Sequence, residues 1–176
     1  MLSCATVGEL LYFLGIFETL QAQIIEELGR SKGEELLIQL QQLPLKKSHA
    51  VTRLGSYSCR GEKALSIRLQ FAQEPEQLQQ TLLHEIAHFL DHQTRPAIGA
   101  YRNPHGHSWQ RWLQRVGADR ETDRSVAMST LYRQRLKPVA RCKRCGQLLE
   151  RLRRLPQKQR WLHRNCGGLF VPIDKL

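Results

Sequence analysis

The stretch Leu82-Leu83-His84-Glu85-Ile86-Ala87-His88-Phe89-Leu90 is the most informative part of the sequence, for both the fold and the chemistry. Side chains four residues apart lie on one face of a helix, so His84 and His88 can direct their imidazoles at one ion. Glu85 lies one residue further round, where its carboxylate can reach a water molecule on that ion. The spacing is typical of zinc peptidases, with two metal ligands and one general base.

A helix over residues 75–93 is expected around this stretch. Pro75 suits a first helical turn, where its missing N–H needs no partner. An apolar face at helical spacing is formed by Leu78, Leu82, Ile86 and Phe89 or Leu90. A lone match to this spacing also arises by chance, so the alternative interpretation is a buried helix whose two histidines are satisfied by hydrogen bonds.

The length and charge of the chain limit its class. With 176 residues it can form one domain with a proper core, or one domain and a small appendage. The net charge of +11 and the pI of about 9.9 favour an anionic partner such as nucleic acid, an acidic protein or an anionic surface. The alternative is a basic protein whose charge only aids solubility.

Nothing in the sequence predicts secretion or a membrane span. The apolar segment 10–17 is flanked by Glu9 and Glu18, lacks a basic leader and is too short to cross a bilayer. The five cysteines are odd in number and three of them cluster, namely Cys4, Cys59, Cys142, Cys145 and Cys166. This usage indicates metal binding in a reducing cytosol rather than a disulfide framework, so we expect a cytoplasmic protein without a membrane partner.

The first half of the chain predicts helices and then a hairpin. Residues 5–28 are expected to form one amphipathic helix that ends at Gly29, and residues 33–43 a second one, both packing on the helix over 75–93. Residues 51–59 and 64–71 predict two strands around a turn at Arg60-Gly61-Glu62. An extended peptide could add as a further strand along 64–71, the alternative being a plain structural hairpin.

A third metal ligand is expected after the loop over residues 94–104. His105 stands at the mouth of this loop, just before a predicted helix with Trp109, Trp112, Leu113 and Val116 on one face. Three protein ligands and one water molecule are the usual set at a catalytic zinc. His107 and Glu121 are alternatives for the third place, and His107 or Tyr101 could stabilise an oxyanion.

His92 also lies on the same stripe of the helix, one turn beyond His88. Three ligands on a straight helix would span about 12 Å, which is too far to surround one ion. His92 is therefore the least favoured third ligand.

The C-terminal segment predicts a second zinc site. Gly117 is expected to end the helix after His105, and residues 125–136 to form another helix before Pro138. Two ligand turns follow, Cys142-Lys-Arg-Cys145-Gly146 and His163-Arg-Asn-Cys166-Gly167-Gly168. Together they give a closed, structural Cys3His site, with free thiols as the alternative. Strands are expected at 148–155 and 159–162, and the metal supplies folding energy because the segment is too small for a core.

Positive charge is concentrated at this end of the chain. Between residues 133 and 164 only Glu150 opposes a set of cations, namely Arg133, Arg135, Lys137, Arg141, Lys143, Arg144, Arg151, Arg153, Arg154, Lys158, Arg160 and Arg164. This density favours a phosphate-binding surface whose affinity falls steeply with salt. No base-reading element is visible, so DNA binding should depend weakly on sequence. The alternative is a solvated face.

With these features the chain resembles the SprT-like family of zinc metallopeptidases, which is related to Spartan proteases. The resemblance covers about residues 34–172 and rests on His84-Glu85-Ile86-Ala87-His88, on His105-Gly106-His107-Ser108-Trp109 and on the terminal ribbon. It implies a zincin-like, minigluzincin-type α+β domain and selects His105 as the third ligand. Eukaryotic members cleave proteins crosslinked to DNA. Here His163 stands where the family's ribbon usually has a cysteine.

The sequence thus predicts an N-terminal helix (1–32), a metallopeptidase domain (33–137) and a zinc ribbon (138–176). The leading hypothesis is a DNA-associated zinc endopeptidase that acts on a protein substrate, with one catalytic and one structural Zn²⁺ and with Glu85 as the general base. A non-enzymatic, zinc-containing nucleic-acid-binding or regulatory protein is the rival. Hydrolysis of a non-peptide bond is a third reading, and the oligomeric state stays open.

Overall fold

The computed structural model describes residues 4–50, 52–95, 104–118, 124–156 and 159–173. The chain divides into two compact units, Met1–Met128 and Ser129–Leu176. Its elements are α1 (Val7–Phe13), α2 (Phe17–Leu28), α3 (Arg30–Gln42), β1 (Leu45–Lys47), β2 (Gly55–Arg60), β3 (Lys63–Leu69), α4 (Pro75–Thr94), α5 (His107–Arg115), α6 (Arg124–Arg135), β4 (Lys137–Cys142), β5 (Leu148–Arg151) and β6 (Phe170–Pro172). This mixture confirms the α+β class, whereas the zincin-like topology and the domain boundaries stay predictions.

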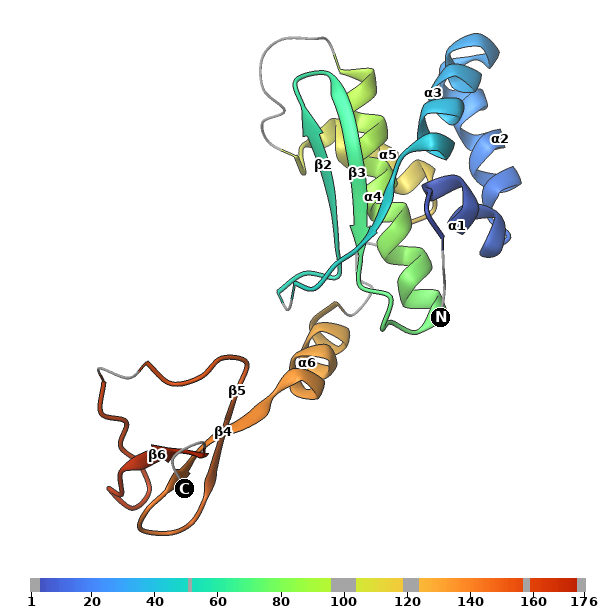
Figure 1. Ribbon diagram of the computed structural model, residues 1–176. Helices are drawn as coiled ribbons and strands as arrows, with labels where there is room; N and C mark the ends of the chain where they lie inside the picture. Colours follow the sequence, from blue (N-terminus) through green and yellow to red (C-terminus); the bar gives the residue numbers. More distant parts are fainter. Residues whose placement is uncertain (1–3, 51, 96–103, 119–123, 157–158, 174–176) are drawn as a thin grey trace. The chain divides into compact units, whose positions relative to one another are not determined.

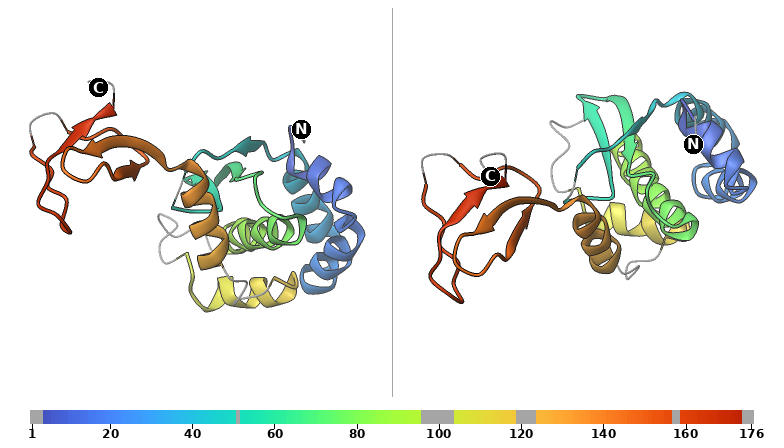
Figure 2. Two further views of the ribbon diagram at one scale, coloured as in Figure 1. Left: turned by 90° about the horizontal axis from the view of Figure 1, so that it is seen from below. Right: turned by 60° about the horizontal axis from the view of Figure 1, so that its bottom comes forward.

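Helix α4 lies at the centre of the first unit. The sheet, α5 and the N-terminal helices pack on different sides of it, as Figures 1 and 2 show. Every residue from Thr81 to Asp91 is buried as a result. Of the described helices, none is long and apolar enough to cross a membrane. The packing around α4 buries the His-Glu-x-x-His stretch next to the hydrophobic core.

The N-terminal region contains two helices where the sequence predicted one over residues 5–28. The prediction was wrong because Gly15 adopts φ = 68°, a left-handed conformation that ends α1. Helix α2 starts again at Phe17, so apolar residues of both helices reach one core. Helix α3 begins at Arg30, three residues ahead of the expected start.

The first sheet has the order β1-β3-β2, with β1 parallel and β2 antiparallel to β3. Strand β1 was not predicted, because three residues are too few to show a periodicity. The turn at Gly61 was predicted correctly, with φ = 59°. Strand β3 is central, so the expectation that a peptide adds along residues 64–71 was wrong. Among the described residues, no strand pairs with the outer side of β2, which starts at Gly55 and lies beside α4, and we call this side its free edge.

The hydrogen bonds that β3 makes toward β1 show which backbone groups of β2 point to that free edge. The N–H of Ile67 donates to Pro44, and the C=O of Leu69 accepts from Ser48. Both bonds run from β3 toward the β1 side. Ile67 and Leu69 therefore do not exchange hydrogen bonds with the residues opposite them on β2.

Those opposite residues are Tyr57 and Gly55. In an antiparallel ladder, a pair that exchanges no hydrogen bonds directs its N–H and C=O groups away from each other. The N–H of Gln70 donates to Leu54, which fits this alternation. The backbone groups of Gly55 and Tyr57 thus face the free edge, where a further strand could pair with them.

The second unit is a sheet of order β5-β4-β6 with both neighbours antiparallel to β4. The expected strand over 148–155 ends at Arg151, and the one expected over 159–162 is reduced to a single bridge between Leu162 and Leu169. Strands β4 and β6 were not predicted. The pairing of these strands depends on the close approach of the two ligand turns to each other. No apolar periodicity in the sequence indicates these strands.

Candidate metal centres and the adjoining cleft

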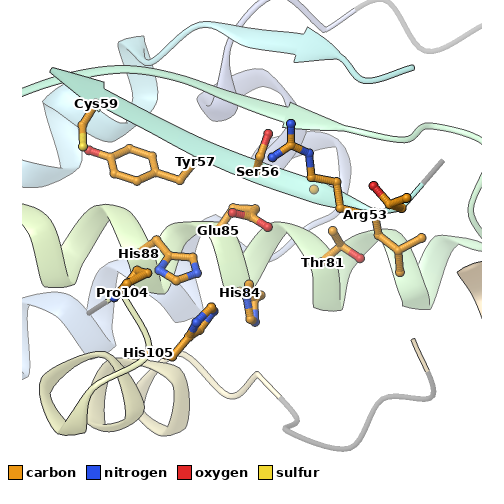
Figure 3. A pocket seen from close by; sticks show the side chains of 13 residues that line it. Arg53, Ser56, Tyr57, Cys59, Thr81, His84, Glu85, His88, Pro104 and His105 are labelled. Carbon is orange, nitrogen blue, oxygen red and sulfur yellow. The ribbon is translucent and has the colours of Figure 1, made fainter. Parts of the chain in front are cut away.

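Three histidines meet beside α4. Nitrogen atoms of His84, His88 and His105 all lie within 4.8 Å of one another. The ring centroids are 4.9 Å apart for His84 and His88, and 4.8 Å apart for His88 and His105. His84 and His88 are each 7% exposed, whereas His105 is exposed. The helical spacing of four therefore brings two rings together, and the turn just before α5 adds the third (Figure 3).

Trp109 forms a common wall for the three imidazoles. Its ring stacks on His88 at a centroid distance of 5.1 Å and meets the edges of His84 at 4.9 Å and His105 at 4.6 Å. Trp109 itself is 6% exposed. The sequence analysis placed Trp109 on the apolar face of a helix and in the His105–Trp109 element that carries the family resemblance, but it assigned this residue no contact with the imidazoles.

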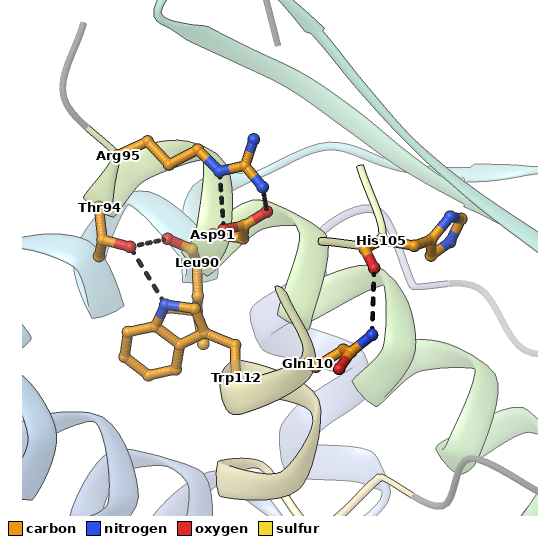
Figure 4. Close-up of polar contacts among 7 residues, drawn as sticks. All are labelled: Leu90, Asp91, Thr94, Arg95, His105, Gln110 and Trp112. Atoms are coloured by element: carbon orange, nitrogen blue, oxygen red, sulfur yellow. Dashed lines mark hydrogen bonds and ion pairs between the residues drawn. The ribbon is translucent and has the colours of Figure 1, made fainter. Parts of the chain in front are cut away.

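Helix α5 is fixed to the end of α4 by polar contacts drawn in Figure 4. Trp112 Nε1 donates to Thr94 Oγ1 at 3.1 Å, and that hydroxyl donates to the carbonyl of Leu90 at 2.7 Å. Arg95 pairs with the fully buried Asp91 through two bonds of 2.9 and 2.7 Å. These contacts fix α5 against the end of α4, and His105 lies in the turn just before α5.

Glu85 lies where β2 approaches α4 most closely. Its side chain is buried, with 6% of its surface exposed. A Cβ atom placed on Gly55 would come within 2.7 Å of Glu85 Oε1 and 2.8 Å of Thr81 Cγ2. Glycine is thus the residue that lets the edge strand run this close to the carboxylate. Neither Gly55 nor Thr81 was singled out from the sequence, because their role depends on how strand and helix pack.

A cleft of about 470 Å³ opens along the free edge of β2. It is bounded by the edge residues Arg53 to Cys59 except Ser58, by Thr81, Glu85 and two histidines of α4, and by Pro104 and His105. The three imidazoles and the carboxylate therefore share one cleft with the outer side of β2. This combination was not visible in the sequence.

The other predicted ligands lie elsewhere. His92 donates from Nε2 to the carbonyl of Gly61 at 2.9 Å, and its Nδ1 accepts from Tyr57 at 2.8 Å. Both ring nitrogens are engaged with the hairpin, away from the three histidines. His107 is exposed in the first turn of α5 and is outside the cluster of ligand atoms. Glu121 and Tyr101 lie outside the described residues.

The second cluster joins Cys142, Cys145, His163 and Cys166, whose ligand atoms also lie within 4.8 Å of one another. The sulfurs of Cys142 and Cys166 are 3.5 Å apart, and His163 Nδ1 is 3.2 Å from Cys145 Sγ and 3.1 Å from Cys166 Sγ. Gly168 makes room for this, because a Cβ there would be 2.6 Å from Cys142 Sγ. The two ligand turns therefore converge as their equal spacing predicted.

Backbone groups prepare this cluster for metal binding. The N–H of Cys145 and then that of Arg144 donate to the sulfur of Cys142 and lower its pKa to about 6, although desolvation opposes them. The N–H of Gly168 acts in the same direction on Cys166, but desolvation and the neighbouring sulfurs leave the pKa of that thiol raised. A thiolate near neutral pH can bind a metal cation directly. The cation then favours loss of the proton from the neighbouring thiol, so that both sulfurs become ligands.

Both clusters fit zinc. Around a tetrahedral zinc ion, nitrogen ligands lie about 3.4 Å apart and sulfur ligands about 3.8 Å apart. The Cys3His cluster has spacings close to these values, and the histidine nitrogens lie within 4.8 Å of one another. Soft thiolates with imidazole suit a closed structural site, and three imidazoles suit a site with a free position. Both donor sets are therefore compatible with zinc.

The fold and site define an α+β protein with a histidine cluster, a buried glutamate and a separate cysteine-rich unit. The model of the SprT-like family matches residues 18–130, and the chain therefore belongs to the SprT-like family. The match includes most of α2, which the sequence analysis had left outside, and it ends before the Cys3His cluster. Comparisons with curated proteins and with solved structures give no match.

Proposed function

We propose that the protein is a zinc-dependent endopeptidase that acts on DNA-associated proteins. The observation that carries this proposal is the convergence of His84, His88 and His105 in one cleft with Glu85. Membership of the SprT-like family supports a metallopeptidase-related function. The free edge of β2, which borders the same cleft, supports an extended polypeptide as the substrate.

Each group of the cleft then has a chemical task. His84, His88 and His105 would hold a zinc ion, and such an ion would supply a bound water molecule with a pKa of about 7 and would polarise a carbonyl. Glu85 accepts the proton of the attacking water molecule and later donates it to the leaving nitrogen. The backbone groups of Gly55 and Tyr57 hold the peptide extended beside Glu85. Trp109 packs against all three imidazoles and limits their rotation.

Replacing Glu85 tests the proposal. The variant Glu85→Gln keeps the size of the side chain and the three imidazoles, so zinc binding and folding should be unchanged. Turnover of an unfolded or DNA-bound protein should fall about 10²–10⁴-fold, since the general base is lost. Equal turnover by the wild type and the variant would remove Glu85 from the mechanism. Metal analysis alongside should give two zinc ions per chain.

We infer that the second unit supplies the DNA contact. Exposed cations are concentrated among the described residues of this unit, namely Arg133, Lys137, Arg141, Lys143, Arg144, Arg153, Arg154, Arg160 and Arg164. The guanidinium of Arg151 lies 4.7 Å from the centre of the Trp161 ring. Such a surface binds phosphates through counterion release.

The DNA contact is tested with charge reversals. Arg153→Glu with Arg160→Glu should weaken binding to duplex or single-stranded DNA and reduce the slope of log affinity against log salt by about 2. Lys46→Glu with Lys47→Glu on β1 makes the same charge change on the first unit and serves as the control. Equal weakening by both pairs would assign the effect to net charge and refute a specific surface on the second unit.

The rival function is a non-enzymatic, zinc-containing nucleic-acid-binding protein. The concentration of exposed cations on the second unit favours it as a second candidate. It predicts DNA retention that depends on Cys142 and Cys145, with no proteolysis by either the wild type or Glu85→Gln. The activity comparison above therefore decides between the two.

A further inference from the structure

The approach of β2 to Glu85 has a consequence for the general base. The three atoms nearest to a Cβ on Gly55 would be Glu85 Oε1 at 2.7 Å, Thr81 Cγ2 at 2.8 Å and Glu85 Cγ at 2.9 Å. Thr81 cannot yield easily, because it is 2% exposed and its hydroxyl donates to Gln77 and Gln73. A methyl group at position 55 would therefore displace the Glu85 side chain.

We propose that Gly55 is a positioning residue that fixes the place of the Glu85 carboxylate. The backbone conformation of Gly55 is not left-handed, so alanine fits its φ value without strain. The requirement for glycine thus comes from the space that Glu85 occupies. This inference rests on the proposed function of Glu85 as general base.

Gly55 also faces the substrate side of the strand. Its N–H and C=O point to the free edge, and its missing side chain faces α4. A peptide paired at Gly55 therefore lies directly beside Glu85. Position 55 sets the distance between the bound backbone and the carboxylate, and a small error in such a distance is costly in catalysis.

The variant Gly55→Ala tests this role. We expect kcat to fall about 10- to 100-fold while KM changes less than about threefold, because the edge groups remain and the base is displaced. Adding Thr81→Ser removes the methyl group that the new Cβ meets and keeps the hydroxyl. The double variant should recover part of kcat, which a general loss of stability would not allow.

Gly33→Ala is the matched control. A Cβ on Gly33 would lie 3.0 Å from Ile25 Cα, so this variant strains the packing of α2 on α3 away from the cleft. It should lower the melting temperature with kcat preserved. If Gly55→Ala keeps full kcat, or if its loss of kcat is no larger than the fraction of the protein that is unfolded, the proposal is wrong.

A readout without turnover separates this proposal from the proposed function. The carboxyl carbon resonance of Glu85, identified by its loss in Glu85→Gln, should shift in Gly55→Ala and stay in place in Gly33→Ala. An unchanged resonance in Gly55→Ala refutes the positioning role. A shifted resonance together with a wild type that cleaves nothing supports the positioning role and refutes the peptidase function.

The charge of the cleft carries a second, independent inference. Apart from the histidines, Arg53 and Glu85 are the charged residues among the described ones that line it. Arg53 is exposed, and no ion pair of the described residues includes it. Figure 3 shows Arg53 and Thr81 toward one end of the cleft and Tyr57 and Cys59 toward the other.

We infer that Arg53 makes this end of the cleft select a substrate segment with an acidic side chain and reject a basic one. Attraction to a carboxylate and repulsion of a cation both act through the same guanidinium, so they add when the two substrates are compared. The inference names the substrate class of the proposed peptidase and rests on that function.

A charge swap tests the selection. In a peptide series with Glu, Gln or Lys at each position, the wild type should prefer Glu over Lys about threefold to tenfold in kcat/KM at one position. Arg53→Glu should reverse this preference, and high salt should weaken it. Arg60→Glu makes the same charge change at the exposed far end of β2, outside the cleft lining, and should leave the preference intact.

The same peptide series can be used in binding measurements, which do not require the protein to cleave a peptide. Anisotropy titrations of Glu85→Gln with labelled Glu and Lys peptides should show the same order of affinities and the same reversal by Arg53→Glu. A preference that survives Arg53→Glu, or that Arg60→Glu reverses equally, refutes the role of Arg53. Binding with the expected preference by a protein that cleaves no peptide supports it and rejects only the peptidase function.

Discussion

The two candidate metal clusters of this protein are held in opposite ways. His84 and His88 lie in a helix whose neighbours Leu82, Ile86 and Phe89 are completely buried in a large apolar core. In the second unit, the described side chains that are buried are those of Ala140, Cys142 and His163, and two of these are candidate ligands. The first cluster is therefore positioned by packing, whereas the second is expected to be positioned by the metal itself.

This difference suits the roles proposed for the two clusters, which are catalytic for the histidines and structural for the Cys3His cluster. A catalytic site must keep its geometry while one coordination position stays available, so its ligands need support from the fold. A structural site gains folding energy from a closed set of four ligands. The comparison can be tested by disturbing each unit in turn.

The largest effect is expected in the second unit, from Cys145→Ser or from a strong chelator. A structural zinc site contributes roughly 10–16 kcal/mol of folding free energy, more than so small a core can replace. The sheet of β4, β5 and β6 should lose its amide dispersion in NMR spectra while the first unit stays folded. Loss of both units together would contradict the division between packing and metal.

The converse disturbance is Phe89→Ala in the first unit. Removing this fully buried ring should lower the free energy of unfolding by about 3–5 kcal/mol. Denaturant unfolding followed by tryptophan fluorescence measures the loss. Zinc retained by the Cys3His cluster is the internal control, and its release in this variant would contradict independent support of the two clusters.

His105→Ala sharpens the comparison within the first unit. His105 is exposed and lies in the turn just before α5, so its loss should leave the core intact. Zinc affinity of the histidine cluster should fall more than the roughly 10- to 100-fold that loss of a supporting partner costs. Competition with a chromogenic chelator measures the affinity. The variant His107→Ala is the control, and equal effects would reopen the choice of third ligand.

The smallest effect is expected from Tyr57→Phe, at alkaline pH. Burial first, and then the neighbouring Cys59, raise the pKa of the Tyr57 hydroxyl above its usual value. The neutral form is favoured in the folded state, so this stabilisation is complete below about pH 10 and is lost as the pH rises further.

Thermal unfolding of the wild type and of Tyr57→Phe between pH 8 and 11.5 measures that dependence. The variant should lose about 1 kcal/mol at neutral pH, from the hydrogen bond to His92. It should also show a smaller decline with alkali than the wild type. A parallel decline in both proteins would show that Tyr57 does not titrate in this range.

The sequence by itself determined those parts of the molecule that depend on local spacing. Helix α4 and the convergence of His84 with His88 follow from the period of a helix. The pairing of the two ligand turns follows from the short loop within each of them. The break at Gly15 could not be predicted, because a glycine inside an apolar periodic segment can also continue a helix.

Tertiary structure alone decided which strand forms the free edge and what lies beside Glu85. The order β1-β3-β2 depends on a three-residue strand that carries no pattern of its own. The requirement for glycine at position 55 arises between a strand and a helix some thirty residues apart, where two surfaces share a volume too small for one methyl group. Spacing along the chain encodes contacts within an element, and only packing shows which elements meet.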